Sequence, residues 1–190
     1  MNIFNIVIAG VGGQGVLMAS KVLAESALAC GMDVKQNEVH GMAQRGGSVI
    51  SFVRIGDQVY SPVVMPGSAD ILLSFEPLEA LRYVHYLKPG GKLVYNNITI
   101  NPSTVASGLA VYPGDVEEQI AKACPNARGI DALAIAKQAG NAKAVNMVMV
   151  GSVMKSLPVD AAVVEEVVRK ISKDKGVEVN LKALQGGAAA

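Results

Sequence analysis

The sequence has few aromatic residues and no tryptophan. Phe, Trp and Tyr make up only 4% of its 190 residues, although 51% of the residues are hydrophobic. The core must therefore be built from aliphatic side chains and methionine, which suits parallel strands that helices bury on both faces. A chain of this length is typical of one domain, so we expect a single domain over residues 1–190.

The sequence also has no large excess of positive or negative charge and no long apolar run. The formal net charge is +1, which provides neither a basic stripe for nucleic acid nor a polybasic segment for a membrane surface. No stretch approaches the ~20 apolar residues of a membrane span. The short apolar start at Met1–Val11 has no basic region before it and runs into glycines, unlike a signal peptide. We expect a cytoplasmic protein with no nucleic-acid or membrane partner.

Cysteine is scarce as well. The chain has two, Cys30 and Cys124, and they lie far apart in the sequence. This excludes a disulfide framework, and there is neither a CxxC pair for zinc nor a cysteine run for an iron–sulfur cluster. We therefore expect no metal or cluster to be bound by this chain.

The hydrophobic pattern predicts alternating strands and helices. An apolar strand at Ile3–Ala9 leads through glycines into a helix over Gln14–Cys30, and Asp33–Val39 is a second strand. Strands at Ala69–Phe75 and Lys92–Asn96 enclose a helix that begins at Pro77. The pattern predicts an α/β fold with a Rossmann-like, doubly wound, mostly parallel sheet. The remaining expected elements are a strand at Leu109–Tyr112 and helices at Asp115–Cys124, Asp131–Gln138, Ala142–Lys155 and Asp160–Ser172.

Two further expectations concern less regular segments. Ser48–Ile55 and Gln58–Val64 flank Gly56-Asp57 and are rich in β-branched residues. This predicts an antiparallel hairpin added to the sheet. From Gly176 onward the periodicity fades, and residues 186–190 are expected to form a loose tail.

A glycine-rich turn connects the first strand to the first helix. Residues Gly10–Gly15 read GVGGQG, which contains the GxGxxG pattern of dinucleotide sites in the required context. Such a turn lets backbone N–H groups and the helix dipole attract an anion such as a phosphate. Glu38 lies where an NAD site needs an acid, whereas a turn used only for packing explains the glycines equally well. The candidate cofactor-binding or interface residues here are Gly10, Gly12, Gly13, Gln14 and Gly15.

A second motif, HGMAQRGG at His40–Gly47, follows the second strand. Arg45 is suited to clamp a carboxylate or phosphate with two hydrogen bonds, and His40 to hydrogen-bond or transfer a proton. The alternative is a surface turn in which Arg45 pairs with a carboxylate such as Glu38 or Glu76. We expect Gly12 and Arg45 to face one crevice at the carboxyl ends of the first strands. The candidates from this motif are His40, Gln44, Arg45, Gly46 and Gly47; no catalytic residue is assigned.

One apparent cofactor motif fails on inspection. Gly56-Asp57 followed by Asn96-Asn97 is similar to the signature of a thiamine diphosphate site, but Gln58 stands where the next glycine belongs and the separation is too long. We therefore expect no thiamine site in this chain.

The two glycine motifs together form a specific resemblance. The chain resembles the gamma-type family of 2-oxoacid:ferredoxin oxidoreductases over nearly its whole length, and most of all the indolepyruvate type. The stretches that carry the resemblance are IAGVGGQGV at Ile8–Val16, NEVHGMAQRGGSV at Asn37–Val49, Ser61-Pro62, ADILLSFEPLEALR at Ala69–Arg82, and Asn146 before Gly151.

The resemblance implies an activity that this chain does not perform alone. Enzymes of this family oxidatively decarboxylate a 2-oxoacid with CoA to an acyl-CoA and reduce ferredoxin, and the indolepyruvate type acts on aryl pyruvates. Thiamine diphosphate, magnesium and the iron–sulfur clusters belong to other domains or to a larger partner subunit. The resemblance therefore implies that larger subunit as the partner, with ferredoxin reached through the complex.

Three alternatives remain open from the sequence. The chain is compatible with the gamma subunit of a pyruvate, ketoisovalerate or 2-oxoglutarate enzyme, because substrate contacts can lie on the partner. A stand-alone NAD-dependent dehydrogenase is a second alternative, although no hydride-transfer constellation is recognisable. A binding module for CoA or another nucleotide is the third.

Overall fold

The computed structural model describes residues 3–40, 46–172 and 176–190. Within them, the strands are β1 (Phe4–Val11), β2 (Asp33–His40), β3 (Ser48–Gly56), β4 (Ala69–Ser74), β5 (Leu87–Asn96) and β6 (Arg128–Ile130). The helices are α1 (Val16–Ala29), α2 (Pro77–Tyr83), α3 (Ser103–Ala106), α4 (Val116–Ala123), α5 (Ala132–Ala139), α6 (Val145–Met154), α7 (Ala161–Ile171) and α8 (Val177–Ala189). Two short 3-10 helices, η1 (Val84–Tyr86) and η2 (Ala142–Ala144), follow α2 and precede α6.

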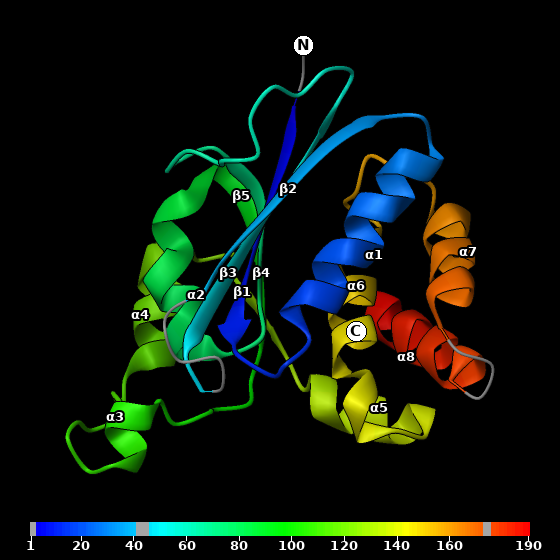
Figure 1. Ribbon diagram of the computed structural model, residues 1–190. Helices are drawn as coiled ribbons and strands as arrows, with labels where there is room; N and C mark the ends of the chain where they lie inside the picture. The colour runs from blue at the N-terminus through cyan, green and yellow to red at the C-terminus, as the bar shows by residue number, and fades with distance from the viewer. Residues whose placement is uncertain (1–2, 41–45, 173–175) are drawn as a thin grey trace.

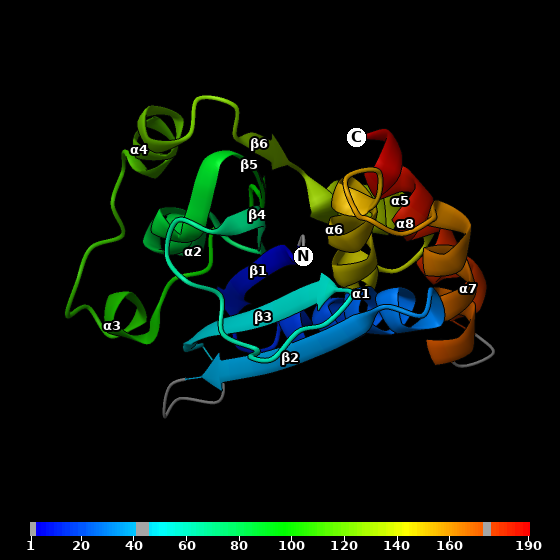
Figure 2. The same cartoon turned by 90° about the horizontal axis from the view of Figure 1, so that it is seen from above.

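All six strands form one sheet in the order β2-β3-β1-β4-β5-β6. Strands β1, β4, β5 and β6 are parallel, whereas β3 runs antiparallel to both of its neighbours, β1 and β2. Helices cover both faces of the sheet (Figure 1 and Figure 2). This confirms the predicted α/β fold with a mostly parallel, doubly wound sheet and an antiparallel addition.

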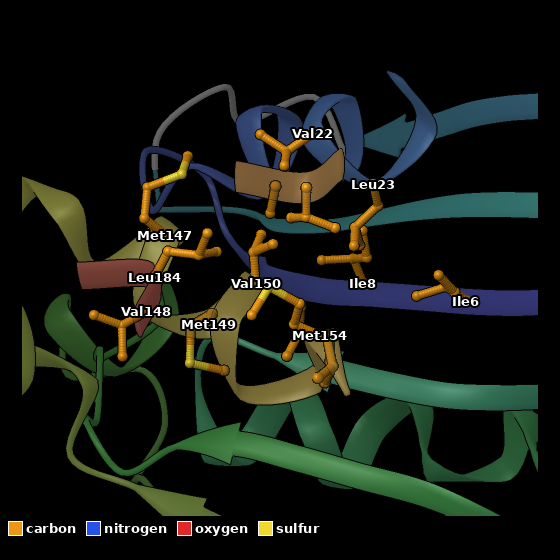
Figure 3. Packing of buried hydrophobic residues seen from close by; sticks show 14 of the residues in the cluster. Ile6, Ile8, Val22, Leu23, Met147, Val148, Met149, Val150, Met154 and Leu184 are labelled. Carbon is orange, nitrogen blue, oxygen red and sulfur yellow. The ribbon is translucent and has the colours of Figure 1, made fainter. Parts of the chain in front are cut away.

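The sheet separates two hydrophobic cores. In β1, Ile6 and Ile8 belong to the core shared with α1, α6, α7 and α8, whereas Val7 and Ala9 belong to the core shared with α2 and α4. Successive side chains of a strand point to opposite faces, which explains this alternation. Figure 3 shows the first core, in which β1 packs against methionine and valine side chains of α6. Burial on both faces accounts for the continuous apolar runs in the sequence.

The predicted hairpin was assigned to the wrong pair of segments. β3 pairs with the preceding β2, in a register that runs from Asp33 opposite Gly56 to His40 opposite Val49. Gln58–Val64, which is described throughout, forms no strand. The Val59 N–H instead donates a hydrogen bond to an Asp33 carboxylate oxygen (2.7 Å), and the Val59 side chain is buried. Two of the three valines of this segment, Val59 and Val64, are thus explained by burial and not by strand pairing.

The expected loose tail was also wrong, because α8 (Val177–Ala189) extends through it and packs on α6. An added Cβ at Gly187 would lie 2.0 Å from the Val148 carbonyl oxygen, and one at Gly151 would lie 2.0 Å from the Leu184 carbonyl oxygen. The glycines therefore allow the two helix backbones to touch. They weaken the hydrophobic pattern in the sequence, which is why the helix was missed.

The strand predicted at Leu109–Tyr112 was the third error. This segment has no regular structure, and its Leu109 and Val111 side chains are 83% and 89% exposed. It belongs to the long connection between β5 and α4. This connection includes α3 and projects from the body of the protein (Figure 1 and Figure 2). Its apolar residues thus point to a surface and not to the sheet.

Candidate functional site

The candidate site lies at the edge where the parallel strands end. The glycine turn follows β1, Glu76 follows β4 and Asn96 is the last residue of β5. Because β3 runs in the opposite direction, its first residue, Ser48, is brought to the same edge. The glycine turn therefore lies at the carboxyl edge, where ligands of open α/β sheets bind.

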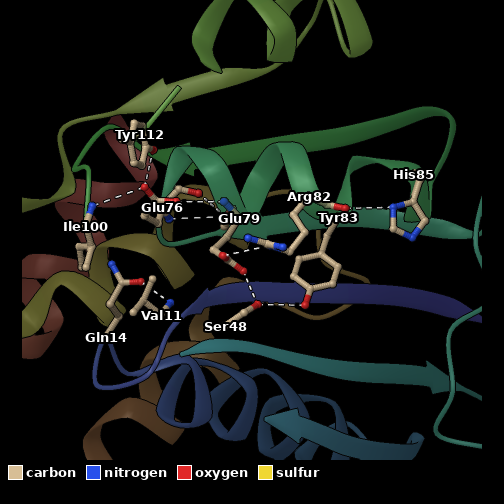
Figure 4. Close-up of polar contacts among 11 residues, drawn as sticks. Val11, Gln14, Ser48, Glu76, Glu79, Arg82, Tyr83, His85, Ile100 and Tyr112 are labelled. Carbon is tan, nitrogen blue, oxygen red and sulfur yellow. Dashed lines mark hydrogen bonds and ion pairs between the residues drawn. The ribbon is translucent and has the colours of Figure 1, made fainter. Parts of the chain in front are cut away.

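The glycine turn is held together by the Gln14 side chain. The Val11 N–H donates to Gln14 Oε1 (2.7 Å), and Gln14 Nε2 donates to the Phe75 carbonyl oxygen (2.8 Å) (Figure 4). Gly13 and Gly15 have φ angles of +104° and +91°, which favour glycine. Both ends of the Gln14 amide are thus bound to backbone groups, and its first role is to fasten β1 and β4 to the turn.

We expect Gln14→Leu to lower the free energy of unfolding by roughly 1–3 kcal/mol for each backbone group that it leaves unpaired. Leucine has a similar size but can neither accept from Val11 nor donate to Phe75. Urea unfolding followed by circular dichroism measures the change. Gln138→Leu, at an exposed position of α5, is the matched control, and equal stability of the two variants would contradict this role of Gln14.

The two glycine motifs meet in the structure. The Gly12 N–H donates to the Gly47 carbonyl oxygen (2.8 Å), which joins the turn to the residue that precedes β3. His40 ends β2 and is exposed, and Gly46 lies in a turn. Gln44 and Arg45 lie outside the described residues. The common crevice of Gly12 and Arg45 therefore stays a prediction.

A cavity of about 430 Å³ lies between the glycine turn and the ends of β2 and β3, and Gly13, Glu38 and His40 are among its lining residues. In a dinucleotide-binding sheet the strand that carries the acid lies next to the first strand. Here β3 lies between β1 and β2, which moves Glu38 one strand spacing, about 4.8 Å, further away. The Gly12 N–H also already donates to the Gly47 carbonyl oxygen, so it is not available to a phosphate. These features disfavour the NAD alternative.

A second cavity of about 470 Å³ lies on the opposite side of the glycine turn. Asn96, which is only 1% exposed, lines it, and Asn96 Oδ1 accepts a hydrogen bond from the Ala132 N–H (3.1 Å). The cavity is also lined by residues of the segment after β5, of η2 and of the start of α6, among them Ile98, Ile100, Lys143 and Asn146. No local sequence pattern indicates this cavity, because its walls come from three distant segments.

Glu76 is a buried carboxylate, 1% exposed, that connects α2 to the projecting segment. One oxygen, Oε2, accepts from the Glu79 N–H (3.0 Å) and so caps α2. The other, Oε1, accepts from the Tyr112 hydroxyl (2.6 Å) and the Ile100 N–H (3.4 Å) (Figure 4). Burial, and after it the hydrogen bond to Glu76, raise the pKa of the Tyr112 phenol well above its ordinary value. A single carboxylate thus holds both ends of residues 100–112.

Glu79, one turn later and 3% exposed, holds the other wall of the site. Its carboxylate accepts hydrogen bonds from the Ser48 hydroxyl and from Arg82 Nε (3.2 Å). The Ser48 hydroxyl also lies 3.0 Å from the Tyr83 hydroxyl (Figure 4). These contacts fix the start of β3, which directly follows the second glycine motif. Both acids lie in a block that carried the family resemblance. From the sequence, Glu76 was named only as a candidate ion-pair partner of Arg45, and Glu79 was assigned no role.

The described residues contain no group of three or more His, Cys, Asp or Glu side chains that could hold a metal ion. The two cysteines of the sequence end α1 and α4, helices on opposite faces of the sheet (Figure 1). They therefore do not fit an iron–sulfur cluster. In the same described parts, no helix combines the length and apolar character needed to cross a membrane.

Comparison with known proteins agrees with this architecture. A family model described as pyruvate ferredoxin/flavodoxin oxidoreductase matches residues 5–190. Indolepyruvate oxidoreductase subunit IorB of Pyrococcus horikoshii is 46% identical, over 100% of this chain and 96% of that protein. The protein of the same name from Archaeoglobus fulgidus is 42% identical, over 96% of this chain and 92% of its own length.

Solved structures show the same fold. The gamma subunit of a keto/oxoacid ferredoxin oxidoreductase from Geobacter sulfurreducens is 26% identical with a TM-score of 0.72, over 98% of this chain and 99% of that one. In a 2-oxoglutarate:ferredoxin oxidoreductase from Magnetococcus marinus, 19% identical with a TM-score of 0.74, the fold occupies 31% of a longer chain. On the family match and the identity to its relatives, the chain belongs to the pyruvate ferredoxin/flavodoxin oxidoreductase family.

Proposed function

We propose that the chain acts as one domain and is the smaller, non-thiamine subunit of an indolepyruvate-type 2-oxoacid:ferredoxin oxidoreductase. The observation that carries this is the 42–46% identity to subunits of that type over 96–100% of the chain. The complex would oxidatively decarboxylate an aryl pyruvate with CoA to an acyl-CoA and reduce ferredoxin in the cytoplasm. Thiamine diphosphate, magnesium and the iron–sulfur clusters are assigned to the larger subunit.

The geometry of the site supports a role in shaping a crevice. The described walls of its two cavities include glycine backbone and the Gln14 amide, whose ends are both bound to backbone groups. Behind these walls two buried carboxylates, Glu76 and Glu79, are engaged in internal hydrogen bonds. His40 is the one imidazole among the described lining residues of the two cavities. Such walls can position a substrate and enclose the site. The reacting groups are assigned to the partner subunit.

The same edge offers an apolar surface for the partner. Leu109 and Val111 are 83% and 89% exposed, and Leu17 and Val39, at 54% and 50%, lie near the glycine turn. No charged residue occurs in Asn97–Gly114, although this segment is largely exposed. Exposed apolar side chains and a lack of charge are typical of the core of a protein interface. We therefore assign the larger subunit to this edge.

Anaerobic coexpression of the chain with the larger subunit from the same host tests the proposal. We expect a brown, stable complex that contains thiamine diphosphate and iron, whereas the chain alone binds neither and has no visible absorption. The double variant Leu109→Asp/Val111→Asp is expected to lose at least tenfold in affinity for the larger subunit, because it places charge in an apolar contact. Pull-down and size-exclusion chromatography measure this loss.

Tyr60→Asp is the matched control for that surface. Tyr60 is 78% exposed and lies in the connection between β3 and β4, at the opposite edge of the sheet, so this variant is expected to assemble normally. A chain that recruits no larger subunit but binds NAD or CoA alone would support the stand-alone alternatives. Turnover of pyruvate, ketoisovalerate or 2-oxoglutarate in preference to indolepyruvate would identify another member of the family.

A further inference from the structure

The segment after β5, residues 97–111, forms an arm that takes little part in the packing of the protein. Of its described side chains, none belongs to either of the two cores that the sheet separates. Its hydrogen bonds run mostly within the arm itself, where the Leu109 and Ala110 N–H groups both donate to the Thr104 carbonyl oxygen (2.9 and 3.1 Å). A segment with few buried apolar contacts can open without unfolding the rest of the chain.

The two ends of the arm have different surroundings. Ile98 and Ile100, near its start, are partly buried and line the cavity of about 470 Å³ beside the glycine turn. Leu109 and Val111, near its end, are largely exposed and belong to the apolar surface that is assigned to the larger subunit. One short segment thus supplies a wall of the cavity and a contact surface for the partner.

Both ends of the arm are fastened by one buried carboxylate. Glu76 Oε1 accepts from the Ile100 N–H (3.4 Å) near the start and from the hydroxyl of Tyr112 (2.6 Å), which directly follows the arm (Figure 4). Glu76 is itself held in place, because its other oxygen caps α2. Where the arm leaves β5, the Asn97 N–H donates to the Ile130 carbonyl oxygen (2.9 Å). The arm is therefore hinged at β5 and held against the body of the protein by Glu76.

We propose that the arm is a flap over the cavity beside the glycine turn, with Glu76 as its latch, and that the larger subunit holds the flap closed. The coupling to the partner rests on the proposed function, which places the larger subunit on Leu109 and Val111. A partner that binds the arm in its closed position shifts the population toward that position. Ile98 and Ile100 then complete the cavity wall. Glu76 is thus a positioning residue, and assembly shapes a cavity whose walls the partner need not touch.

Amide hydrogen exchange of the full chain, resolved by NMR and repeated in low concentrations of urea, tests the flap without a partner. We expect exchange at the Ile100 amide to depend less on urea than exchange at the core amide of Ile8, because local opening exposes little surface. Tyr112→Phe removes one of the two contacts at Glu76 Oε1. Hydrogen bonds to charged groups are among the stronger ones, so exchange at Ile100 should accelerate about tenfold. Tyr86→Phe, at a partly buried position of η1, is the control that leaves this exchange unchanged.

The same measurement with the larger subunit added tests the coupling. We expect exchange at the Ile100 and Leu109 amides to slow by about tenfold or more, because the bound partner opposes opening of the arm. The amide of Val59, which lies in the connection at the opposite edge of the sheet, is the internal control and should keep its rate.

Three outcomes would overturn the inference. Equal urea dependence at Ile100 and Ile8 would show that the arm opens only when the whole chain unfolds, and unchanged exchange in Tyr112→Phe would show that Glu76 is no latch. A larger subunit that binds without slowing exchange at Ile100 would refute the coupling. Absence of any binding would instead refute the proposed function, and with it the coupling, while exchange in the free chain would still decide whether Glu76 latches the arm.

Discussion

The Gly187→Ala variant is expected to lose about 3 kcal/mol or more of unfolding free energy, at the upper end of the range for overpacked sites. The new Cβ would lie 2.0 Å from the carbonyl oxygen and 2.8 Å from the carbonyl carbon of Val148. Backbone atoms of a buried helix can give way only if α6 and α8 move apart. Helix propensity alone would make the alanine variant about 1 kcal/mol more stable than glycine. A loss of stability would therefore have to come from the backbone contact.

Gly186→Ala, one residue earlier, is the matched control. Its Cβ would meet a single atom, the Ile135 Cγ2 methyl group, at 2.7 Å, and this partly buried side chain can be displaced without moving the backbone of α6. We expect stability within about 1 kcal/mol of the original, because the gain in helix propensity offsets the adjustment. Thermal and urea unfolding compare the two variants. Equal effects at both positions would show that α8 does not pack on α6 in solution.

The Glu76→Ala variant is expected to lose about 3–7 kcal/mol of unfolding free energy. It removes a helix cap worth ~1 kcal/mol and leaves the partly buried Tyr112 hydroxyl and Ile100 N–H without their acceptor, at about 1–3 kcal/mol for each group. Residues 100–112 would then lose their attachment to α2. We expect faster proteolysis in this segment, detected by mass spectrometry of the fragments. Glu118→Ala, at an exposed position of α4, is the control, and equal losses in both variants would contradict the proposed attachment.

The Tyr112 phenol gives a second measure of the same contact. Burial and the Glu76 hydrogen bond raise its pKa in the folded state, above the ordinary value of about 10 that applies when the chain is unfolded. Its contribution to stability is therefore complete below about pH 10 and is lost as the pH rises from there toward the folded-state pKa. Tyr112→Phe is expected to flatten this alkaline loss, as urea midpoints measured at increasing pH would show.

Local signals made much of the fold predictable. Apolar runs that stop at glycines, such as Ile3–Ala9 before Gly10, predicted the ends of β1 and α1 to within two residues. The predictions of secondary structure failed where a residue type that usually indicates one structure was present for a different structural reason. Val59 suggested a strand but is buried in an irregular segment, and Gly187 suggested a tail but permits contact with α6. In both places the partner, which lies far away in the sequence, decides the structure.

For the candidate site, the position in the fold was easier to predict than the roles of the individual residues. The glycines identified the crevice because a turn between a strand and a helix is a local pattern. Gln14 was expected to face a ligand, yet its amide is bound by Val11 and Phe75. Glu79 was not singled out, and Glu76 was named only as a candidate partner of Arg45, because their hydrogen-bond partners come from segments before and after them that meet only in the folded chain.

The alternation within β1 also bears on how freely the sequence can vary. Val7 and Ile8 are neighbours in the chain but contribute to different cores. A residue substituted in one core therefore has few contact partners in common with a residue substituted in the other. Free-energy changes at sites without common partners are close to additive. The layer of α2 and α4 could therefore be reshaped during evolution to follow a changing partner, while the layer of α1, α6, α7 and α8 independently keeps the chain folded.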